Sequence, residues 1–398
     1  MIDLVVIGGG AAGFFGAINA AEKHPGLQVV LLEKGKQLLG KVKVSGGGRC
    51  NVTHACFEPE ELIRYYPRGG QELLGPFHRF MTYDTIAWFQ SRGVALKTEA
   101  DNRMFPESNV SQTIIDCFLK EAQKHGVKIY TECGLRQFER ENDHWKVQTE
   151  HETFLTKKIL FACGSSPQIW ELFKSKGHHI EAPVPSLFTF NISDARIQGL
   201  PGLSVPYVTV SIKDSSLEAD GPLLITHWGL SGPGILRLSA FGARYLADCD
   251  YRFVLCINFS GLPFKETLAA LKLLRDAEGK KLCGSTPQYQ LPSRWWKSIT
   301  DHLGITDIKW ASLSNLQLEG LAKELSVAEF EVTGKSTFKD EFVTCGGIRL
   351  AEVNMKTMQS RILPDVYFAG EMLDIDAITG GFNFQAAWTT SFIASDLQ

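Results

Sequence analysis

The feature that most constrains this chain is a glycine-rich turn that begins at residue 8. An apolar run, Leu4–Ile7, leads into Gly8–Gly13 (GGGAAG), and Phe14–His24 follows with the small residues and the spacing of a helix. A second apolar run, Gln28–Leu32, ends in the acidic residue Glu33. The order strand, Gly-x-Gly-x-x-Gly, helix, strand, acid predicts a dinucleotide-binding unit built on parallel strands.

Each position of this turn has a physical task. Gly8 permits the tight turn, Gly10 lets the backbone approach a pyrophosphate, and Gly13 lets the helix pack close to the strand. The helix N-terminus offers unpaired N–H groups and the positive end of its dipole to the phosphates. Glu33, twenty residues past Gly13, can accept hydrogen bonds from both hydroxyls of an adenosine ribose. The predicted contacts here are Gly8, Gly10, Ala11, Ala12, Gly13 and Glu33.

A second glycine-rich segment, residues 35–56, predicts another ligand loop. The glycines Gly46–Gly48 would each weaken a helix or strand interior by about 0.5–1 kcal/mol, so they indicate close approach of the backbone to a flat or anionic group. The segment also carries positive charge and polar side chains that can direct hydrogen bonds. These residues are Lys41, Lys43, Ser45, Arg49, Asn51 and Thr53.

The remaining pattern predicts an α/β unit that an insert interrupts. Before residue 188 helices alternate with strands, and DNRMFPES (101–108) is predicted to form a turn. From residue 188 the pattern becomes strand-rich, with three helices between residues 263 and 325. The pattern after residue 335 resembles the first part again, so we predict one discontinuous domain with an insert at 188–335.

The last segment, residues 342–397, offers a second glycine-led helix. A short apolar strand, Asp365–Ala369, runs into Gly370 and Glu371, and Gly380 and Gly381 precede a helix. We expect the strand to end beside the exit of the first strand. The N–H groups and positive dipole end of the helix would then face the far half of the dinucleotide.

The composition narrows the class of protein. Of the 398 residues, 44% are hydrophobic and 21% are charged, which is typical of water-soluble globular proteins. The formal net charge of −3 provides no overall attraction to nucleic acid or anionic membrane, so neither is an expected partner. Nine cysteines without a Cys-x-x-Cys motif indicate reduced thiols and a cytoplasmic protein, and no His/Cys cluster has the spacing of a metal site.

Taken together, long motifs of this chain resemble one family, the BaiN-type (also called YhiN-type) flavoproteins. The motifs are GGGAAG…LLEK, KVSGGGRCNVT, THWGLSGPGILRLS, TCGGI…NMKTMQS and YFAGEMLD…GGFNFQAAW, and they extend over nearly the whole sequence. The resemblance implies a glutathione-reductase-like Rossmann domain that binds FAD noncovalently in extended form. It also implies an inserted β-barrel-like domain with a helical subdomain. The predicted domains are 1–187 with 336–398, and the insert 188–335, in which 188–262 with 326–335 form the barrel and 263–325 the helices.

The resemblance also assigns residues to parts of the FAD. The adenosine side would meet Glu33 and Lys34, and the loop from Ser45 to Asn51 would lie against the flavin and ribitol. Gly370 and Glu371 would lie near the ribitol and phosphates, and the helix start at 380–384 beside the pyrimidine edge of the flavin. The cofactor residues predicted beyond the first turn are therefore Lys34, Lys41, Ser45, Gly46, Gly47, Gly48, Arg49, Cys50, Asn51, Leu135, Ala162, Gly164, Gly370, Glu371, Gly381, Phe382, Asn383 and Phe384.

The family's best-known activity implies an FAD-dependent oxidoreductase that reduces a conjugated carbon–carbon double bond of a small apolar molecule, as in oxo-steroid bile acids. Only one good Gly-x-Gly-x-x-Gly is present, so NAD(P)H would serve as a transient electron donor without a second Rossmann domain. Two alternatives stay open: a flavin thiol–disulfide oxidoreductase, and a non-enzymatic flavin-carrying binding protein.

Four residues carry open alternatives for the chemistry. Cys50 and Cys56 lie after the glycine loop, as redox cysteines do in disulfide reductases, but five residues separate them where four are needed. His227 could protonate a substrate carbanion or enolate, or be a turn histidine satisfied by backbone groups. Arg49 could bind a substrate anion or a cofactor phosphate. His227 and Arg49 are therefore the candidate catalytic residues.

Overall fold

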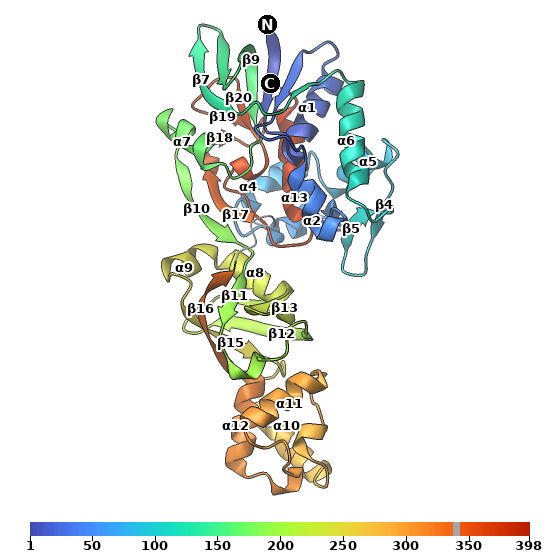
Figure 1. The fold of residues 1–398 in the computed structure, drawn as a ribbon, viewed down its shortest axis with the longest axis vertical. Coiled ribbons are helices and arrows are strands. Elements are labelled where there is room, and N and C mark those ends of the chain that lie inside the picture. Colours follow the sequence, from blue (N-terminus) through green and yellow to red (C-terminus); the bar gives the residue numbers. More distant parts are fainter. Residues whose placement is uncertain (337–342) are drawn as a thin grey trace. The chain divides into compact units, whose positions relative to one another are not determined.

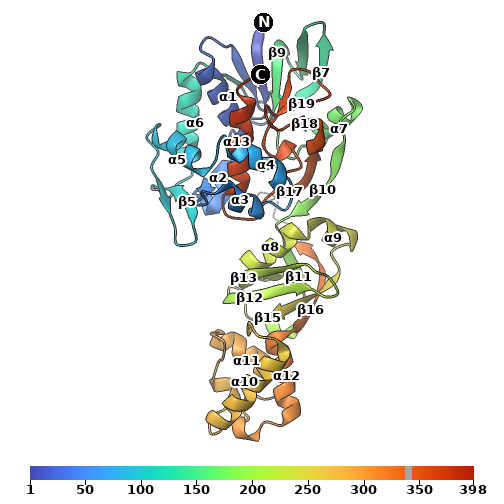
Figure 2. The same ribbon diagram turned by 180° about the vertical axis from the view of Figure 1, so that it is seen from behind.

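The computed structural model describes residues 1–336 and 343–398, which form two compact units (Figures 1 and 2). The first unit contains residues 1–184 and the described residues from 343 onward, and the second runs from 185 to 336. Each unit has a hydrophobic core of its own. The domain limits at 188 and 335 stay a prediction, and residues 337–342, which that prediction gives to the first domain, lie outside the described residues.

A mixed sheet, with parallel strands at its middle and antiparallel strands at one edge and in a hairpin, forms the centre of the first unit. Its strands are β1 (Ile2–Ile7), β2 (Val29–Leu32), β6 (Lys128–Tyr130), β7 (Leu135–Glu141), β8 (His144–Thr149), β9 (Thr153–Phe161), β18 (Val353–Asn354), β19 (Gln359–Ser360) and β20 (Val366–Phe368). They lie in the order β18-β19-β20-β9-β1-β2-β6, and β7 and β8 form a hairpin that joins β9 through β8. β1 pairs in parallel with both β2 and β9, which explains why its apolar run is buried.

The strand β20 was expected to end beside the exit of the first strand. It pairs with β9, and β9 lies between β20 and β1. The residue after the strand, Gly370, comes close to the start of the first helix, because a Cβ on Gly370 would lie 3.1 Å from the Cβ of Ala12.

Eight α-helices accompany this sheet in the described part of the first unit. They are α1 (Ala11–Lys23), α2 (Gly40–Gly48), α3 (Pro59–Leu62), α4 (Gly70–Phe77), α5 (Thr82–Gln90), α6 (Gln112–Lys124), α7 (Pro167–Ser175) and α13 (Phe382–Ala394). α1 packs against both α6 and α13, so the first and the last helix of the chain share one core (Figure 1). Phe15 of α1 fixes this contact, since its ring lies 4.6 Å from Trp88 and 5.2 Å from Trp388.

Short strands complete the first unit and overturn the turn predicted at 101–108. β5 (Arg103–Pro106) lies between β3 (Thr53–His54) and β4 (Leu96–Thr98) in an antiparallel sheet, and β10 (Ile180–Ser186) pairs with β17 (Val343–Ile348). The sequence DNRMFPES has turn chemistry, yet pairing partners on both sides impose an extended backbone on its four central residues, Arg103–Pro106.

The second unit is a closed barrel with helices. The barrel strands are β11 (Thr189–Ile192), β12 (Ser204–Ile212), β13 (Glu218–Ile225), β14 (Gly229–Ser231), β15 (Phe253–Asn258) and β16 (Ala328–Ser336). They close in the order β11-β14-β13-β12-β15-β16, with β11 paired to β16. The β-barrel-like insert that the family resemblance implied is thus present as a six-stranded barrel.

Five helices belong to the described part of this unit: α8 (Pro233–Phe241), α9 (Ala243–Asp248), α10 (Phe264–Ala277), α11 (Ser293–His302) and α12 (Asn315–Ser326). Trp295, Trp296 and Trp310 are fully buried at the centre of the helical part. In the residues that the structure describes, no helix combines the length and the apolar composition that crossing a membrane requires.

Candidate functional site

The turn between β1 and α1 is held by a backbone contact that admits only glycine. A Cβ on Gly13 would lie 1.8 Å from the carbonyl oxygen of Gly8, far inside contact distance. Gly10, which precedes α1, is different, because a Cβ there would meet none of the described atoms within 4 Å. No side chain caps the N-terminus of α1, so its first N–H groups stay available for an anion above Gly10.

Glu33, at the end of β2, already accepts two backbone hydrogen bonds. Its carboxylate oxygens receive the N–H groups of Gly9 at 2.7 Å and Gly35 at 2.8 Å. The carboxylate therefore anchors the glycine turn to the end of β2. A carboxylate accepts about four hydrogen bonds, so two positions are left for ribose hydroxyls.

The predicted ligand loop is the broken second half of α2. The helix is interrupted at Ser45, which has an extended ψ of 148°, and Gly46, Gly47 and Gly48 follow with φ values of 57°, 68° and 82°. Three successive residues in the left-handed region explain why the sequence has glycines here. A Cβ on Gly47 or Gly48 would point into open space, as at Gly10.

Asn51 supplies an unpaired acceptor in the same loop. The residue is buried, and its side-chain Oδ1 has no hydrogen-bond partner among the described residues. The adjacent carbonyl of Val52 accepts a 2.9 Å hydrogen bond from the indole of Trp388, which holds the loop against α13. A buried acceptor without a donor is costly, so this atom indicates a ligand that donates a hydrogen bond.

Arg49, a catalytic and cofactor candidate, has protein partners. Its guanidinium forms a 2.5 Å ion pair with Glu99 and lies 3.9 Å from the centre of the Phe105 ring. These contacts fasten the loop to β5. The role of Arg49 toward a phosphate or a substrate stays a prediction.

The C-terminal segment meets the glycine turn as well as the ligand loop. Gly370 approaches Ala12, and a Cβ on Gly164 would lie 3.4 Å from a carboxylate oxygen of Glu371. The same oxygen of Glu371 forms an ion pair with Lys41 at 2.5 Å. Residues far apart in the sequence therefore surround one place, next to the first turn of α1.

The start of α13 is shaped by its own asparagine. Asn383 accepts a hydrogen bond from the N–H of Ala377 and donates one to the carbonyl of the same residue, both at 3.0 Å. Gly381, with φ 95°, passes so close to Thr53 that a Cβ would lie 2.6 Å from its carbonyl carbon. The helix N-terminus is thereby fixed beside the ligand loop.

Two residues near this helix start were absent from the predicted site. The ring of Tyr65 stacks on Phe382 at 4.3 Å, and the ring of His54 lies 4.4 Å from Phe382. His54 donates from Nδ1 to the carbonyl of Gly380 at 3.1 Å. Burial lowers the pKa of His54, against the opposing effect of this hydrogen bond, so the ring is neutral near pH 7. The sequence signal for His54 was its place directly after the loop.

The other predicted residues lie around this centre. A Cβ on Gly8 would lie 2.4 Å from the carbonyl oxygen of Ala162, which places the end of β9 at the turn. Leu135 follows Gly134, and a Cβ added to Gly134 would lie 3.2 Å from the Cβ of Lys34. Phe384 stacks on Trp388, with 5.4 Å between the ring centres.

The cysteines of the loop have the wrong electrostatics for disulfide exchange. Burial raises the pKa of the Cys50 thiol to about 12, and burial also raises that of Cys56. Disulfide exchange needs a thiolate, which these environments suppress near neutral pH. This observation disfavours the thiol–disulfide alternative.

The acidic segment before α13 contains a buried carboxylate. Asp376 is fully buried and forms an ion pair with Arg68. The pair ties the segment before α4 to the segment before α13. In the described residues no group of three or more His, Cys, Asp or Glu side chains is arranged to hold a metal ion.

The arrangement as a whole fits a dinucleotide such as FAD. Open space at Gly10, Gly47 and Gly48 leaves room where side chains would stand, and the unpaired Asn51 Oδ1 and the carboxylate of Glu33 provide acceptors. Helix N-termini from both ends of the chain add N–H donors.

His227 lies in the second unit, at a hollow of about 490 Å³. Trp228 and Thr226 line the same hollow, together with part of the segment 193–201. His227 is exposed, and its ring has no hydrogen bond or ion pair to any residue that the structure describes. The histidine is thus open to a ligand of this hollow, and the turn-histidine alternative, with its ring satisfied by backbone groups, is not observed.

Comparisons with known proteins extend over the whole chain. The family described as "HI0933-like protein Rossmann domain" matches residues 2–397. A ribosomal RNA dihydrouridine synthase of Escherichia coli is 26% identical, covering 99% of this chain and 98% of that protein. A 3-dehydro-bile acid delta(4,6)-reductase of Clostridium scindens is 24% identical, covering 98% and 97%.

Solved structures agree on the fold. A 3-ketosteroid-Δ4-(5α)-dehydrogenase from Rhodococcus jostii, solved with 4-androstene-3,17-dione, has a TM-score of 0.53 at 12% identity. The match covers 99% of this chain and 96% of that one. At this identity the likeness supports the architecture alone.

Proposed function

Since the chain belongs to the HI0933-like Rossmann family of FAD-dependent oxidoreductases, we propose that it reduces a carbon–carbon double bond conjugated to a carbonyl group. One observation carries this proposal: two relatives are named for different substrates, but the double bond in each substrate is of this same type. Dihydrouridine arises when two hydrogens are added to the C5=C6 bond of uracil, which is conjugated to C4=O. The bile acid reductase is named for double bonds that are conjugated to a 3-oxo group.

The chain's own residues hold the cofactor in this proposal. The N-terminus of α1 and the turn at Gly10 bind the pyrophosphate, and Glu33 accepts the ribose hydroxyls of the adenosine. Lys41 and Glu371 would hold the part of FAD where the ribitol meets the phosphates, and Asn51 would accept a hydrogen bond from the flavin part. FAD, bound noncovalently, supplies the hydride for the double bond.

The electron donor in this proposal is NADH or NADPH, which binds transiently while it reduces the flavin. A single Gly-x-Gly-x-x-Gly in the sequence supports this, because the turn is already assigned to FAD. The proton for the second carbon would come from His227 or from water. The exposed, unpartnered ring of His227 supports the first source.

Two substrate classes follow from the relatives, an unsaturated small molecule and a uridine in RNA. The family resemblance favoured a small apolar molecule, and the net charge of −3 argued against nucleic acid. The relatives named for ribosomal RNA favour the uridine. All nine cysteines are free, which supports a reducing compartment such as the cytoplasm.

The test is an anaerobic titration of the purified yellow protein. NADH and NADPH are added separately while flavin absorbance is followed, and then an acceptor is added. We expect reduction by one nicotinamide and reoxidation by 2-cyclohexen-1-one or by uridine-containing RNA. Cyclohexanone, which lacks the double bond, is the matched control. Reoxidation by disulfides or oxygen alone, with no response to either conjugated acceptor, would contradict the proposal.

A further inference from the structure

The second unit carries two adjoining hollows. The hollow at His227, of about 490 Å³, and another of about 470 Å³ are both lined by Gln198. The second hollow is bordered by exposed residues of α11, among them Arg294 and Lys297. Because Gln198 belongs to both, the two hollows lie next to each other on this unit.

The first hollow has an exposed tryptophan on a rigid turn. Trp228 is 58% exposed, whereas tryptophan side chains are usually largely buried. The turn itself is fixed: the N–H of Thr226 bonds to the carbonyl of Gly229 at 2.8 Å, and Ile192 donates to the carbonyl of Trp228 at 3.0 Å. A Cβ on Gly229 would lie 2.1 Å from the carbonyl oxygen of Phe190. The fold therefore holds the turn in place and leaves the indole at the surface.

The second hollow adds positive charge. Arg294 donates to the carbonyl of Gly199 at 2.7 Å, which joins α11 to the segment between the hollows. Lys297, one turn further along α11, has no side-chain partner among the described residues. Of the acids nearby, Asp194 pairs with Arg196 at 2.7 Å. Asp301, which lines the second hollow together with Lys297, accepts a hydrogen bond from Thr306 and forms no ion pair with Lys297. Lys297 thus remains available for a ligand anion.

We propose that this face binds a single-stranded segment of RNA, an inference that rests on the proposed function and chooses its substrate class. A base would stack on Trp228, and phosphates would contact Arg294 and Lys297. An aromatic ring beside cations is the combination that single-stranded nucleic acid requires, because every base has a stacking face and every linkage a charge. We call these residues the RNA face: His227, Trp228, Arg294, Lys297 and His302.

Charge and lining favour RNA over a purely apolar ligand. A steroid ring system would be best covered by apolar side chains, but these hollows are lined largely by polar and charged residues. The relative named for ribosomal RNA aligns over 99% of this chain, so the alignment includes this unit. A steroid carboxylate, which combines an apolar body with one anion, is the competing occupant for the test.

The experiment measures binding of a fluorescent oligouridylate of about 12 nucleotides, within the range of single-stranded sites. The full-length FAD-loaded protein is titrated by anisotropy at several salt concentrations. We expect Trp228→Ala to weaken binding roughly 5- to 100-fold, the loss typical of one stacked base. Trp228→Phe keeps a ring and should stay within about threefold of the parent protein. Lys297→Gln should lower the salt slope by about 0.7, the value for one phosphate contact.

Matched controls lie elsewhere on the same unit. Tyr207 is 57% exposed and lines neither hollow, so Tyr207→Ala removes an equally exposed ring. Lys272 is exposed on α10, so Lys272→Gln removes an equivalent charge. Both controls should bind the RNA like the parent protein, and thermal melting checks the folding of every variant.

Several outcomes would overturn the inference. They are no saturable RNA binding by the parent protein, equal affinity of Trp228→Ala, or an equal loss in Tyr207→Ala. Binding of cholate without RNA binding would assign the face to a steroid carboxylate. The reductase proposal is judged separately, from reoxidation of the parent protein by 2-cyclohexen-1-one. That reaction would persist if only the RNA inference failed.

Discussion

Glu33 has a structural task apart from any ligand, since it accepts the N–H groups of Gly9 and Gly35. A variant at this position therefore changes both the turn and the ribose contact. The two effects are separable, because apo-protein stability reports the first and FAD affinity the second.

We expect Glu33→Gln to raise the Kd for FAD roughly 10- to 100-fold. The amide retains one acceptor oxygen and loses the charge, and a hydrogen bond to a charged group is worth about 1.5–3 kcal/mol. Quenching of flavin fluorescence measures the Kd, and thermal melting of the apo-protein measures the cost to the turn. Glu132→Gln changes an exposed carboxylate, 60% of whose side chain is accessible, and is the control. An unchanged Kd would remove Glu33 from the site.

Cys50 provides a second test at this scale. Because burial raises the pKa of its thiol to about 12, the thiolate is scarce at pH 8, and we expect Cys50 to resist iodoacetamide in the native protein. Mass spectrometry of the peptides identifies the labelled positions, and the denatured protein, in which all nine thiols are free, is the control. Rapid native labelling of Cys50 would restore the thiol–disulfide alternative.

Within the turn between β1 and α1, two nearby glycines are needed for different reasons. Gly10 has open space where a Cβ would stand, but Gly13 is in contact with the backbone of Gly8. The first glycine is free of steric contact within the described protein, and the second is required by the fold itself.

We predict opposite results for the two alanine variants. Gly10→Ala should leave the free energy of unfolding of the apo-protein within about 0.5 kcal/mol of the parent value and weaken FAD binding more than about tenfold. Gly13→Ala should destabilise the apo-protein by several kcal/mol, roughly the upper range for strained core substitutions. Gly75→Ala, also in open space, is the control. Unweakened FAD binding by Gly10→Ala would contradict the assigned pyrophosphate position.

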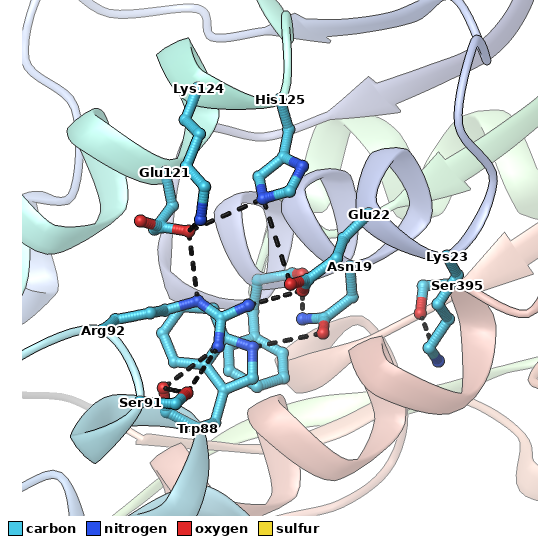
Figure 3. Close-up of polar contacts among 11 residues, drawn as sticks. Asn19, Glu22, Lys23, Trp88, Ser91, Arg92, Glu121, Lys124, His125 and Ser395 are labelled. Carbon is cyan, nitrogen blue, oxygen red and sulfur yellow. Dashed lines mark hydrogen bonds and ion pairs between the residues drawn. The ribbon is translucent and has the colours of Figure 1, made fainter.

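Figure 3 shows a polar cluster that joins α1, α6 and the end of α5. Glu121 is buried there, and its carboxylate oxygen Oε2 accepts a 2.9 Å hydrogen bond from Lys124 Nζ. The side-chain nitrogens of Arg92 and His125 lie 3.4 Å and 3.5 Å from the same oxygen. Burial would raise the pKa of Glu121, but the hydrogen bond from Lys124 and the nearby charges of Lys124 and Arg92 outweigh it and lower the pKa. The ionised form is therefore the one that stabilises this junction.

The lowered pKa gives the sign of a pH effect. The stabilisation is complete above the unfolded value of about 4.3 and is lost as the pH falls through the lower folded value. We expect Glu121→Gln to reduce the free energy of unfolding by about 2 kcal/mol at pH 7, with a smaller difference near pH 3. Urea unfolding at several pH values measures this, with Glu107→Gln as the exposed control. A pH-independent difference would mean that shape, rather than charge, holds the junction.

At the scale of the whole molecule, the sequence best predicts structures whose residues lie close together along the chain. The β1–α1–β2 unit follows from one hexapeptide and one acid, because turn, helix dipole and ribose contact all lie within 33 residues. The C-terminal helix followed from its glycine-led start, whereas the barrel came from the family resemblance, which carries tertiary information that periodicity lacks.

What the sequence did not predict depends on distant partners. Asp376 is buried because Arg68, 308 positions away, pairs with it, and β5 is extended because β3 and β4 flank it. Neither partner is visible in local propensity. The expectation of no nucleic acid used the net charge of the whole chain, and a sum over 398 residues does not describe the exposed cations on one helix.

The ion pair between Lys41 and Glu371 joins residues 330 positions apart, and this separation has a consequence in time. A ribosome adds about 5–20 residues per second, so roughly 20–70 s pass between the synthesis of these two side chains. During that interval the first glycine turn leaves the ribosome, while the segment to which we assign the closing of its ligand site does not yet exist. We therefore expect the chain to bind FAD only near the end of translation. Bound FAD would then distinguish completed chains from chains whose synthesis was interrupted.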